Sequence, residues 1–281
     1  MKASIKSIDG VETRILSAGD GPPLFLLHGV GLSADCFVKN IDPLAQSFSV
    51  IAPDLLGHGF TAAVDYRGTA PQVEMARHVL GVAAALGLSQ FSVAGSSFGA
   101  LVAALIYFMR ADTVDKLVLI GSGSVFHSTE DQRRTLTASQ ANGVAAMSNP
   151  TLAGCRKRLA NIVHSATCIP DEMLLAQLTA YAYPDRIGAY RDTISGAVAS
   201  LDDPEARVIS RLEQLGPDAL VIVGRDDIRA DWNAHASGVK RMPRAALEIY
   251  DDCGHLPFLE HPNLFNSQVD AFLANVSRVA S

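Results

Sequence analysis

Charged residues are scarce in this chain, and none of them cluster into a basic patch. Asp, Glu, Lys and Arg make up 19% of the sequence, with 23 basic and 29 acidic side chains and a net charge of −6. A protein that binds nucleic acid needs a face rich in Lys and Arg. The sequence therefore argues against a nucleic-acid partner, and the mild acidity only favours solubility.

Cysteine is also rare, and its four copies stand far apart. Cys36, Cys155, Cys168 and Cys253 form neither a CxxC motif nor a Cys/His spacing typical of zinc sites. We therefore expect reduced, mostly buried thiols, no metal and no cofactor. The first residues show no apolar signal core, which favours a cytoplasmic location.

The sequence has no uninterrupted apolar segment long enough to cross a membrane. Residues 79–109 carry no charge, but a Ser-Gln pair and a Gly-Ser-Ser turn interrupt them, and a span needs about 20 apolar residues. A helix, a strand, a tight turn and a second helix explain this stretch better. With 48% hydrophobic residues and a mean hydropathy of +0.20, the 281 residues can instead bury a large core.

Short apolar runs alternate with helical patterns along most of the chain. Candidate strands lie at 23–29, 48–54, 91–96, 116–122, 219–227 and 246–255, and helical patterns cover 71–87, 99–110 and 262–279. Continuous apolar runs of this length are typical of parallel strands covered on both faces. The order predicts an α/β fold with a doubly wound, mostly parallel sheet, whose ligands lie beyond the carboxyl ends of the strands.

Residues 126–212 break this alternation. They contain helical patterns, such as 171–182, and no obvious core strand. We interpret them as a helical cap inserted into a core domain formed by residues 1–125 and 213–281. An independent domain is the alternative, but the segment is short and its ends lie between consecutive strands. Its apolar content exceeds the needs of its own small core, so we expect the cap to line a pocket.

The pentapeptide Gly95-Ser96-Ser97-Phe98-Gly99 matches the G-x-S-x-G pattern. It lies between a predicted strand and a predicted helix, which is the context that this motif requires. The sharp turn would lift the Ser97 hydroxyl clear of the sheet, at the positive end of the following helix. The alternative is an ordinary Gly-rich turn, but the context favours Ser97 as a nucleophile.

A serine hydroxyl is a poor nucleophile without a base. Asp227 directly follows the strand near 219–223, and His255 follows the last strand. Both should emerge at the same sheet edge as Ser97, in the chain order Ser, Asp, His. Asp226 competes for the acid role, and we interpret it as a turn residue.

The oxyanion formed in acyl transfer needs two fixed N–H donors. One is expected from Phe98, the residue after the nucleophile. The other is expected from Val30, in the loop His28-Gly29-Val30-Gly31, whose glycines allow close approach of the backbone to a ligand. The alternative for this loop is a Gly-rich strand end over a buried His28.

Five motifs together resemble the α/β-hydrolase superfamily. They are HGVG (28–31), DLLGHG (54–59), GSSFG (95–99), GRDD (224–227) and GHLPFLEHP (254–262). The resemblance covers nearly the whole chain except the cap. It implies an eight-stranded, mostly parallel sheet with an inserted helical cap, and a catalytic triad of Ser97, Asp227 and His255.

Within the superfamily, GSSFGA, KLVLIGSGSV, GRDD and EHPNLFN are similar to meta-cleavage-product C–C hydrolases and to small-acyl carboxylesterases. The C–C hydrolases usually have HGxGPG in the first loop, a Trp after the catalytic His and a carboxylate-binding Arg in the cap. Here the loop is HGVGLS and Leu256 follows the His. The four cap arginines Arg156, Arg158, Arg186 and Arg191 match no such role.

These departures favour a cofactor-independent serine hydrolase that cleaves a carboxylic ester of a small, largely apolar molecule through an acyl-enzyme. C–C hydrolysis of a vinylogous diketo acid by the same triad is the alternative, and a non-catalytic ligand receptor on the same fold is a third. The only expected partner is a small-molecule substrate, with no nucleic acid and no membrane, and a homo-oligomer stays open. Candidate pocket residues are Ser96, Trp232, Leu256, Tyr181, Tyr183 and Met173.

Overall fold

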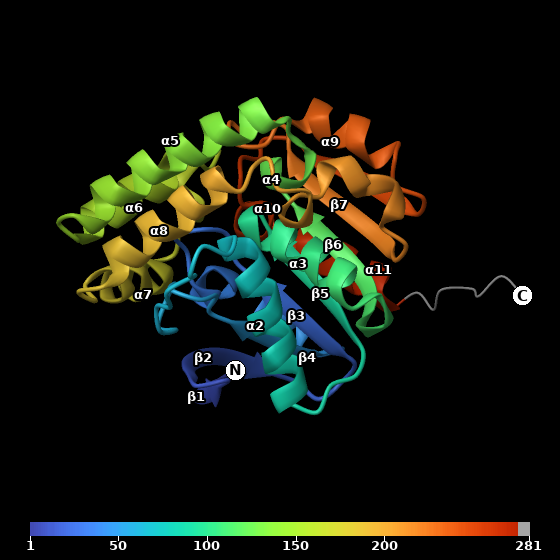
Figure 1. The fold of residues 1–281 in the computed structure, drawn as a ribbon, viewed down its shortest axis with the longest axis horizontal. Helices are drawn as coiled ribbons and strands as arrows, with labels where there is room; N and C mark the ends of the chain where they lie inside the picture. The colour runs from blue at the N-terminus through green and yellow to red at the C-terminus, as the bar shows by residue number, and fades with distance from the viewer. Residues whose placement is uncertain (275–281) are drawn as a thin grey trace, which may run out of the picture.

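The computed structural model describes residues 1–274, which form one eight-stranded sheet in the order β1-β2-β4-β3-β5-β6-β7-β8 (Figure 1). The strands are β1 (Lys2–Ile8), β2 (Val11–Ala18), β3 (Pro23–Leu27), β4 (Ser49–Pro53), β5 (Phe91–Ser96), β6 (Val114–Ile120), β7 (Asp218–Gly224) and β8 (Ala245–Tyr250). Strand β2 pairs antiparallel with β1 and β4, and all other pairs are parallel. The predicted α/β fold with a mostly parallel sheet is confirmed.

Strands β1 and β2 are the part of the sheet that the apolar runs did not indicate. Most β1 side chains are exposed, because this strand lies at the edge of the sheet. The two strands turn at Asp9 and Gly10, which both have positive φ. A half-exposed antiparallel strand carries no continuous apolar run, so only the strands buried on both faces were visible in the sequence.

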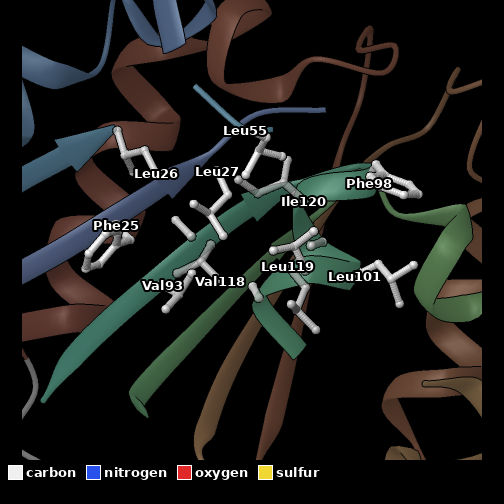
Figure 2. Close-up of a cluster of buried hydrophobic side chains, with 14 of the residues drawn as sticks. Phe25, Leu26, Leu27, Leu55, Val93, Phe98, Leu101, Val118, Leu119 and Ile120 are labelled. Carbon is white, nitrogen blue, oxygen red and sulfur yellow. The ribbon is translucent and has the colours of Figure 1, made fainter. Parts of the chain in front are cut away.

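The core is built on the central strands β3, β5 and β6. Figure 2 shows the side chains of Phe25, Leu27, Val93 and Val118 gathered on neighbouring strands, and all four are fully buried. Each large apolar side chain removed from water in this way stabilises the fold by about 1.5–3 kcal/mol. This rigid layer fixes the positions of the loops at its edge.

Helices cover both faces of the sheet. Helices α2 (Pro71–Ala85) and α3 (Phe98–Met109) lie in front of it in Figure 1, and α11 (Pro262–Ala274) lies behind. Shorter helices α1 (Ile41–Leu44), α9 (Trp232–Val239) and α10 (Pro257–Glu260) complete the layers. The helical pattern predicted for 262–279 extends past the described residues at 275–279. Among the described residues, no helix is both long and apolar enough to cross a membrane.

Between β6 and β7 the described chain is helical and contains no strand. It forms α4 (Gly123–Phe126), α5 (Thr129–Met147), α6 (Leu152–Ala160), α7 (Asp171–Tyr181) and α8 (Arg186–Ala199). Figure 1 shows α5–α8, which we call the insertion helices, grouped together over one end of the sheet. The hydroxyls of Ser128 and Thr151 accept backbone N–H groups at the starts of α5 and α6, which fixes where these helices begin.

Candidate active site

The loop between β5 and α3 holds Ser97 in a backbone conformation that few residues adopt. Its φ of 54° and ψ of −116° lie outside the favoured regions for a side chain with a Cβ. Two hydrogen bonds hold it there: Ser97 N–H donates to Ile120 O at 2.7 Å, and Ser122 Oγ donates to Ser97 O at 2.7 Å. Such strain persists only where the surroundings enforce it, which is common at functional sites.

Both flanking glycines of the motif are required by close backbone contacts. A Cβ on Gly95 would overlap the carbonyl of Gly99, and a Cβ on Gly99 would overlap the carbonyl of Leu27. Helix α3 can therefore start directly above β3 and β5 only with glycine at these positions. The spacing of the pentapeptide follows from this packing.

The loops after β7 and β8 bring Asp227 and His255 together. Asp227 Oδ2 lies 2.8 Å from His255 Nδ1, and both side chains are buried. Asp227 Oδ1 accepts the backbone N–H groups of Arg229 at 2.7 Å and Ala230 at 3.0 Å. The backbone N–H of His255 donates to Ile162 O of the segment between α6 and α7 at 2.7 Å. The carboxylate and the ring are thus fixed in position and orientation.

The neighbouring acid Asp226 points elsewhere. It is exposed, and its Oδ2 lies 2.8 Å from His164 Nδ1 at the surface. The turn places Asp227, and not Asp226, against His255.

Ser97 and His255 line one cavity with two lobes of about 30 Å³ each. Both lobes share Val30, Ser97, Ser139, Arg229 and His255. The first lobe adds Asn142, Arg158, Ile162 and Leu256, and the second adds Phe98, Ser124, Thr135 and Leu136. Helices α5 and α6 therefore form one side of the cavity, and the strand-end loops form the other.

The predicted oxyanion donors lie at this cavity. Phe98 is the first residue of α3, so no carbonyl of that helix is available to its N–H. Val30 follows Gly29, where an added Cβ would stand 3.1 Å from Ser97 Cβ. Burial lowers the pKa of the adjacent His28 to about 4, so its ring is neutral at neutral pH. Its Nε2 accepts from Leu55 N–H at 3.0 Å, which gives this histidine a structural role.

A buried arginine of α6 lies above the loop that carries Val30. Arg158 is 6% exposed, and its Nη2 donates to Val30 O at 3.3 Å. Its guanidinium lies 5.8 Å from the centroid of the Tyr181 ring. Its Nε and Nη1 are buried and have no hydrogen-bond partner, and no carboxylate in residues 1–274 forms an ion pair with it. The cap arginines were noted in the sequence, but only the structure selects Arg158.

Arg229 was not singled out by the sequence, although it stands two residues after Asp227. Its half-buried side chain reaches toward α5, where Nη1 donates to Thr135 O at 3.4 Å, and its Nε has no partner. Burial lowers the pKa of Arg229, and the positive charge of Arg158 lowers it further. The two arginines therefore repel each other within one cavity.

The predicted pocket residues fall in different places. Leu256 lines the first lobe, whereas Ser96 is fully buried with an unpartnered hydroxyl and is absent from both lobes. Tyr181 is buried because its hydroxyl donates to Gly31 O at 2.8 Å, so it joins α7 to the loop after β3.

The other three candidates also lie outside both lobes. Met173 is buried among the core residues, and Tyr183 is 47% exposed and packs against Phe60. Trp232 lies beneath the guanidinium of Arg225. The insertion lines the cavity through α5 and α6, whereas the candidates chosen from its apolar residues, Met173, Tyr181 and Tyr183, lie on α7 or just after it.

Other hollows and clusters lie away from this cavity. Two larger surface hollows, of about 440 and 550 Å³, flank residues 64–71 and contain neither Ser97 nor His255. His164, Asp226 and Asp252 place potential metal-ligating atoms within 4.8 Å of one another, but all three residues are exposed. Neither feature touches the reacting groups.

Comparisons with known proteins place this geometry among hydrolases. A family model described as alpha/beta hydrolase fold matches residues 22–262. A 2-hydroxymuconate semialdehyde hydrolase of Pseudomonas putida is 28% identical over 274 residues, which cover 97% of this chain and 94% of the relative. A 2-hydroxy-6-oxononadienedioate/2-hydroxy-6-oxononatrienedioate hydrolase of Paraburkholderia xenovorans (strain LB400) is 29% identical over 280 residues, covering 96% and 94%.

Solved structures agree on the fold. A meta-cleavage product hydrolase from Pseudomonas fluorescens IP01 has a TM-score of 0.80 at 24% identity, covering 96% of this chain and 97% of that one. An epoxide hydrolase also reaches 0.80 at 21% identity, covering 97% and 98%. Because one fold supports several reactions, the structural likeness does not decide the chemistry. The sequence relatives named above support the C–C hydrolase alternative and give no support to ester cleavage.

Proposed function

The chain belongs to the alpha/beta hydrolase fold family, and from this premise we propose that it is a serine hydrolase that cleaves a carbon–carbon bond in a 2-hydroxy-6-oxo-dienoic acid. The names of the relatives support this class of substrate over a simple ester. The observation that carries the proposal is Arg158, a buried cation with unpaired N–H groups beside the loop of Val30.

In this proposal the side chains of Ser97, His255 and Asp227 each have a distinct role in transferring the proton and stabilising charge. His255 takes the proton of the Ser97 hydroxyl, and Asp227 holds the ring in the required tautomer and stabilises its charged form. The N–H groups of Val30 and Phe98 bind the oxyanion. Each donor is fixed by backbone packing, so little reorganisation is needed as the charge develops.

The reaction consumes one water. The dienol first becomes a vinylogous diketo acid, in which the hydroxyl at carbon 2 has lost its proton and carbon 5 has gained one. Ser97 Oγ then bonds to carbonyl carbon 6, and the bond between carbons 5 and 6 breaks. The electron pair passes into the conjugated keto acid, and the resulting enolate takes the proton held by His255 and leaves as a 2-hydroxydienoate. Water, deprotonated by His255, then releases the acyl group as a carboxylic acid.

The charge of Arg158 explains why an acid suits this cavity better than an apolar ester. A buried guanidinium without a counter-ion is costly, and a carboxylate is its natural bidentate partner. The carboxylate of a dienoate would supply that partner in the first lobe. An apolar ester would leave the cation unpaired, which disfavours binding.

The experiment compares Arg158→Met with Arg156→Met. Arg156 lies two residues away on α6, faces solvent and pairs with Asp171, so it is a matched control. Loss of a buried charge contact costs about 2–5 kcal/mol. We expect Arg158→Met to lower kcat/KM for 2-hydroxymuconate semialdehyde by about 100-fold, measured from the decay of dienol absorbance, while Arg156→Met stays near wild type.

Two results would overturn the proposal. Hydrolysis of nitrophenyl esters of apolar acids together with no turnover of any dienoate would restore ester cleavage as the function. Failure of a fluorophosphonate to label Ser97, with neither substrate class turned over, would instead favour a non-catalytic receptor.

A further inference from the structure

Arg229 has no task in the reaction as proposed so far, yet its side chain lines both lobes of the cavity. Its backbone N–H donates to Asp227 Oδ1, which explains the position of its main chain but not its charge. The side chain leaves this turn and extends toward Thr135 of α5, beside the second lobe. A shorter or apolar residue would satisfy the backbone contact equally well.

Several arginines outside the cavity, both half-buried and exposed, pair with a carboxylate. The half-buried Arg14 pairs with Asp54, and the exposed Arg225 pairs with Asp251. Arg229, which is half-buried, forms no ion pair with any carboxylate in residues 1–274. Charges removed from water are normally paired, so an unpaired arginine that lines the cavity is suited to an anionic partner that arrives with a ligand.

Asp227 is the one carboxylate among the described residues whose charge acts on Arg229, and it is not free to become that partner. Its Oδ1 already accepts two backbone N–H groups, and its Oδ2 is bonded to His255. The second cation, Arg158, repels the charge of Arg229 and so destabilises its charged form further. An anion in the second lobe would therefore offset both the burial of Arg229 and this repulsion.

The lining of the second lobe is suited to a polar end of a substrate. Besides Arg229, it is lined by the hydroxyl-bearing residues Ser124, Thr135 and Ser139. The proposed oxyanion donors Val30 and Phe98 line the same lobe. Arg158 lines only the first lobe, whereas Thr135, whose carbonyl accepts from Arg229, lines only the second. A substrate whose carbonyl lies at Ser97 would therefore extend one end toward Arg158 and the other toward Arg229.

We propose that Arg229 is a specificity-determining residue that binds a second carboxylate, on the acyl part of the substrate, while Arg158 binds the carboxylate of the dienoate part. The acyl part then leaves as a dicarboxylic acid. This inference rests on the proposed function, because it assigns the two ends of the same substrate. It predicts that the protein prefers a dienedioate to a semialdehyde, because a semialdehyde has only a hydrogen atom on carbon 6 and offers Arg229 no carboxylate.

A matched pair of substrates tests this assignment. The pair is 2-hydroxy-6-oxonona-2,4-dienedioate and 2-hydroxy-6-oxonona-2,4-dienoate, which differ only in a terminal carboxylate or methyl group on the acyl part. We expect the wild type to favour the dicarboxylate at least 10-fold in kcat/KM. Arg229→Met should lower the dicarboxylate value by about 100-fold, mainly through KM, and so abolish the preference. Arg229→Lys should restore part of it, because the charge returns.

Arg225→Met is the control, because Arg225 lies on the same turn but is exposed and paired with Asp251. It should keep the wild-type preference. Thermal melting and fluorophosphonate titration of each variant establish that equal amounts of folded active sites are compared. Equal turnover of both substrates by the wild type, or a preference that survives Arg229→Met, would overturn the second carboxylate site while leaving C–C hydrolysis intact.

A failure of the proposed function gives a different result. If no dienoate is cleaved, C–C hydrolysis is wrong. The nitrophenyl monoester of succinate and the nitrophenyl ester of butyrate then test independently whether the second lobe binds an anion. A succinyl preference that is lost in Arg229→Met would support the anion site on the acyl part. Equal rates with both esters, or no hydrolysis of either ester, would refute it.

Discussion

Two groups of polar side chains at the cavity satisfy their hydrogen-bonding groups in different ways. The strand-end side comprises Ser97, Asp227 and His255, and the arginine side comprises Arg158 of α6 and Arg229 of the loop after β7. In the strand-end loops, both oxygens of Asp227 and the Nδ1 of His255 have partners inside the protein. On the arginine side, Arg158 and Arg229 keep buried N–H groups without partners. Groups that act on the reacting atoms need a fixed geometry, whereas groups that bind a ligand need free donors. In the proposed function, the strand-end side carries out the chemistry and the arginine side recognises the substrate.

The largest loss of activity should follow from removing the proposed nucleophile, Ser97, on the strand-end side. Ser97→Ala is expected to lower kcat by roughly 10⁶-fold, because triad members act as a unit. The variant should melt at nearly the wild-type temperature, since the small side chain only lines the cavity. Ser96→Ala is the control, because Ser96 is buried away from both lobes. A dead Ser96→Ala with an active Ser97→Ala would mean that the wrong serine was assigned.

The next largest effect should distinguish the two neighbouring acids. Asp227→Asn is expected to lower kcat by about 10⁴-fold, because an amide favours the wrong tautomer of His255. Asp226→Asn should change kcat little, since Asp226 pairs with His164 at the surface. Steady-state kinetics at equal folded fraction decide between them, and comparable activity of the two variants would contradict the assignment.

The smallest effects concern stability, and their signs should differ. Arg14 lies 2.5 Å from Asp35 and 3.2 Å from the fully buried Asp54, so Arg14→Met leaves a buried carboxylate unpaired. It should lower the free energy of unfolding by about 3–5 kcal/mol. Arg229→Met removes an unpaired cation and should raise the free energy of unfolding by about 1 kcal/mol.

Denaturant melts of the two variants beside wild type measure both changes. If Arg229→Met destabilised the protein as much as Arg14→Met, Arg229 would have a structural role and not a ligand-binding one. If Arg14→Met caused no loss of stability, the expected difference between a paired arginine and the unpaired Arg229 would also be refuted.

The strand-end side was predictable from the sequence because its constraints are local. The turn at Ser97 needs small flanking residues, and Asp227 and His255 each follow a strand whose apolar run marks its end. Sheet topology then carries these three ends to one edge. Strand β1 could not be predicted in the same way, because its side chains are mostly exposed.

The arginine side was not predictable, because it depends on how α6 and the loop after β7 pack around the cavity. Arg156 and Arg158 stand two residues apart on α6 and look alike in the sequence, yet one faces solvent and the other lies in the cavity. The aromatic residue Tyr181 looked like a pocket residue, but its hydroxyl joins α7 to Gly31. Only tertiary packing decides which polar side chains remain unpaired.

The most direct test of the central proposal is the identification of products from 2-hydroxy-6-oxonona-2,4-dienedioate by mass spectrometry. The wild type should convert it to 2-hydroxypenta-2,4-dienoate and succinate, with one succinate oxygen derived from labelled water, and Ser97→Ala should leave it intact. Unchanged dienedioate in the presence of wild-type protein that hydrolyses nitrophenyl esters would contradict the account.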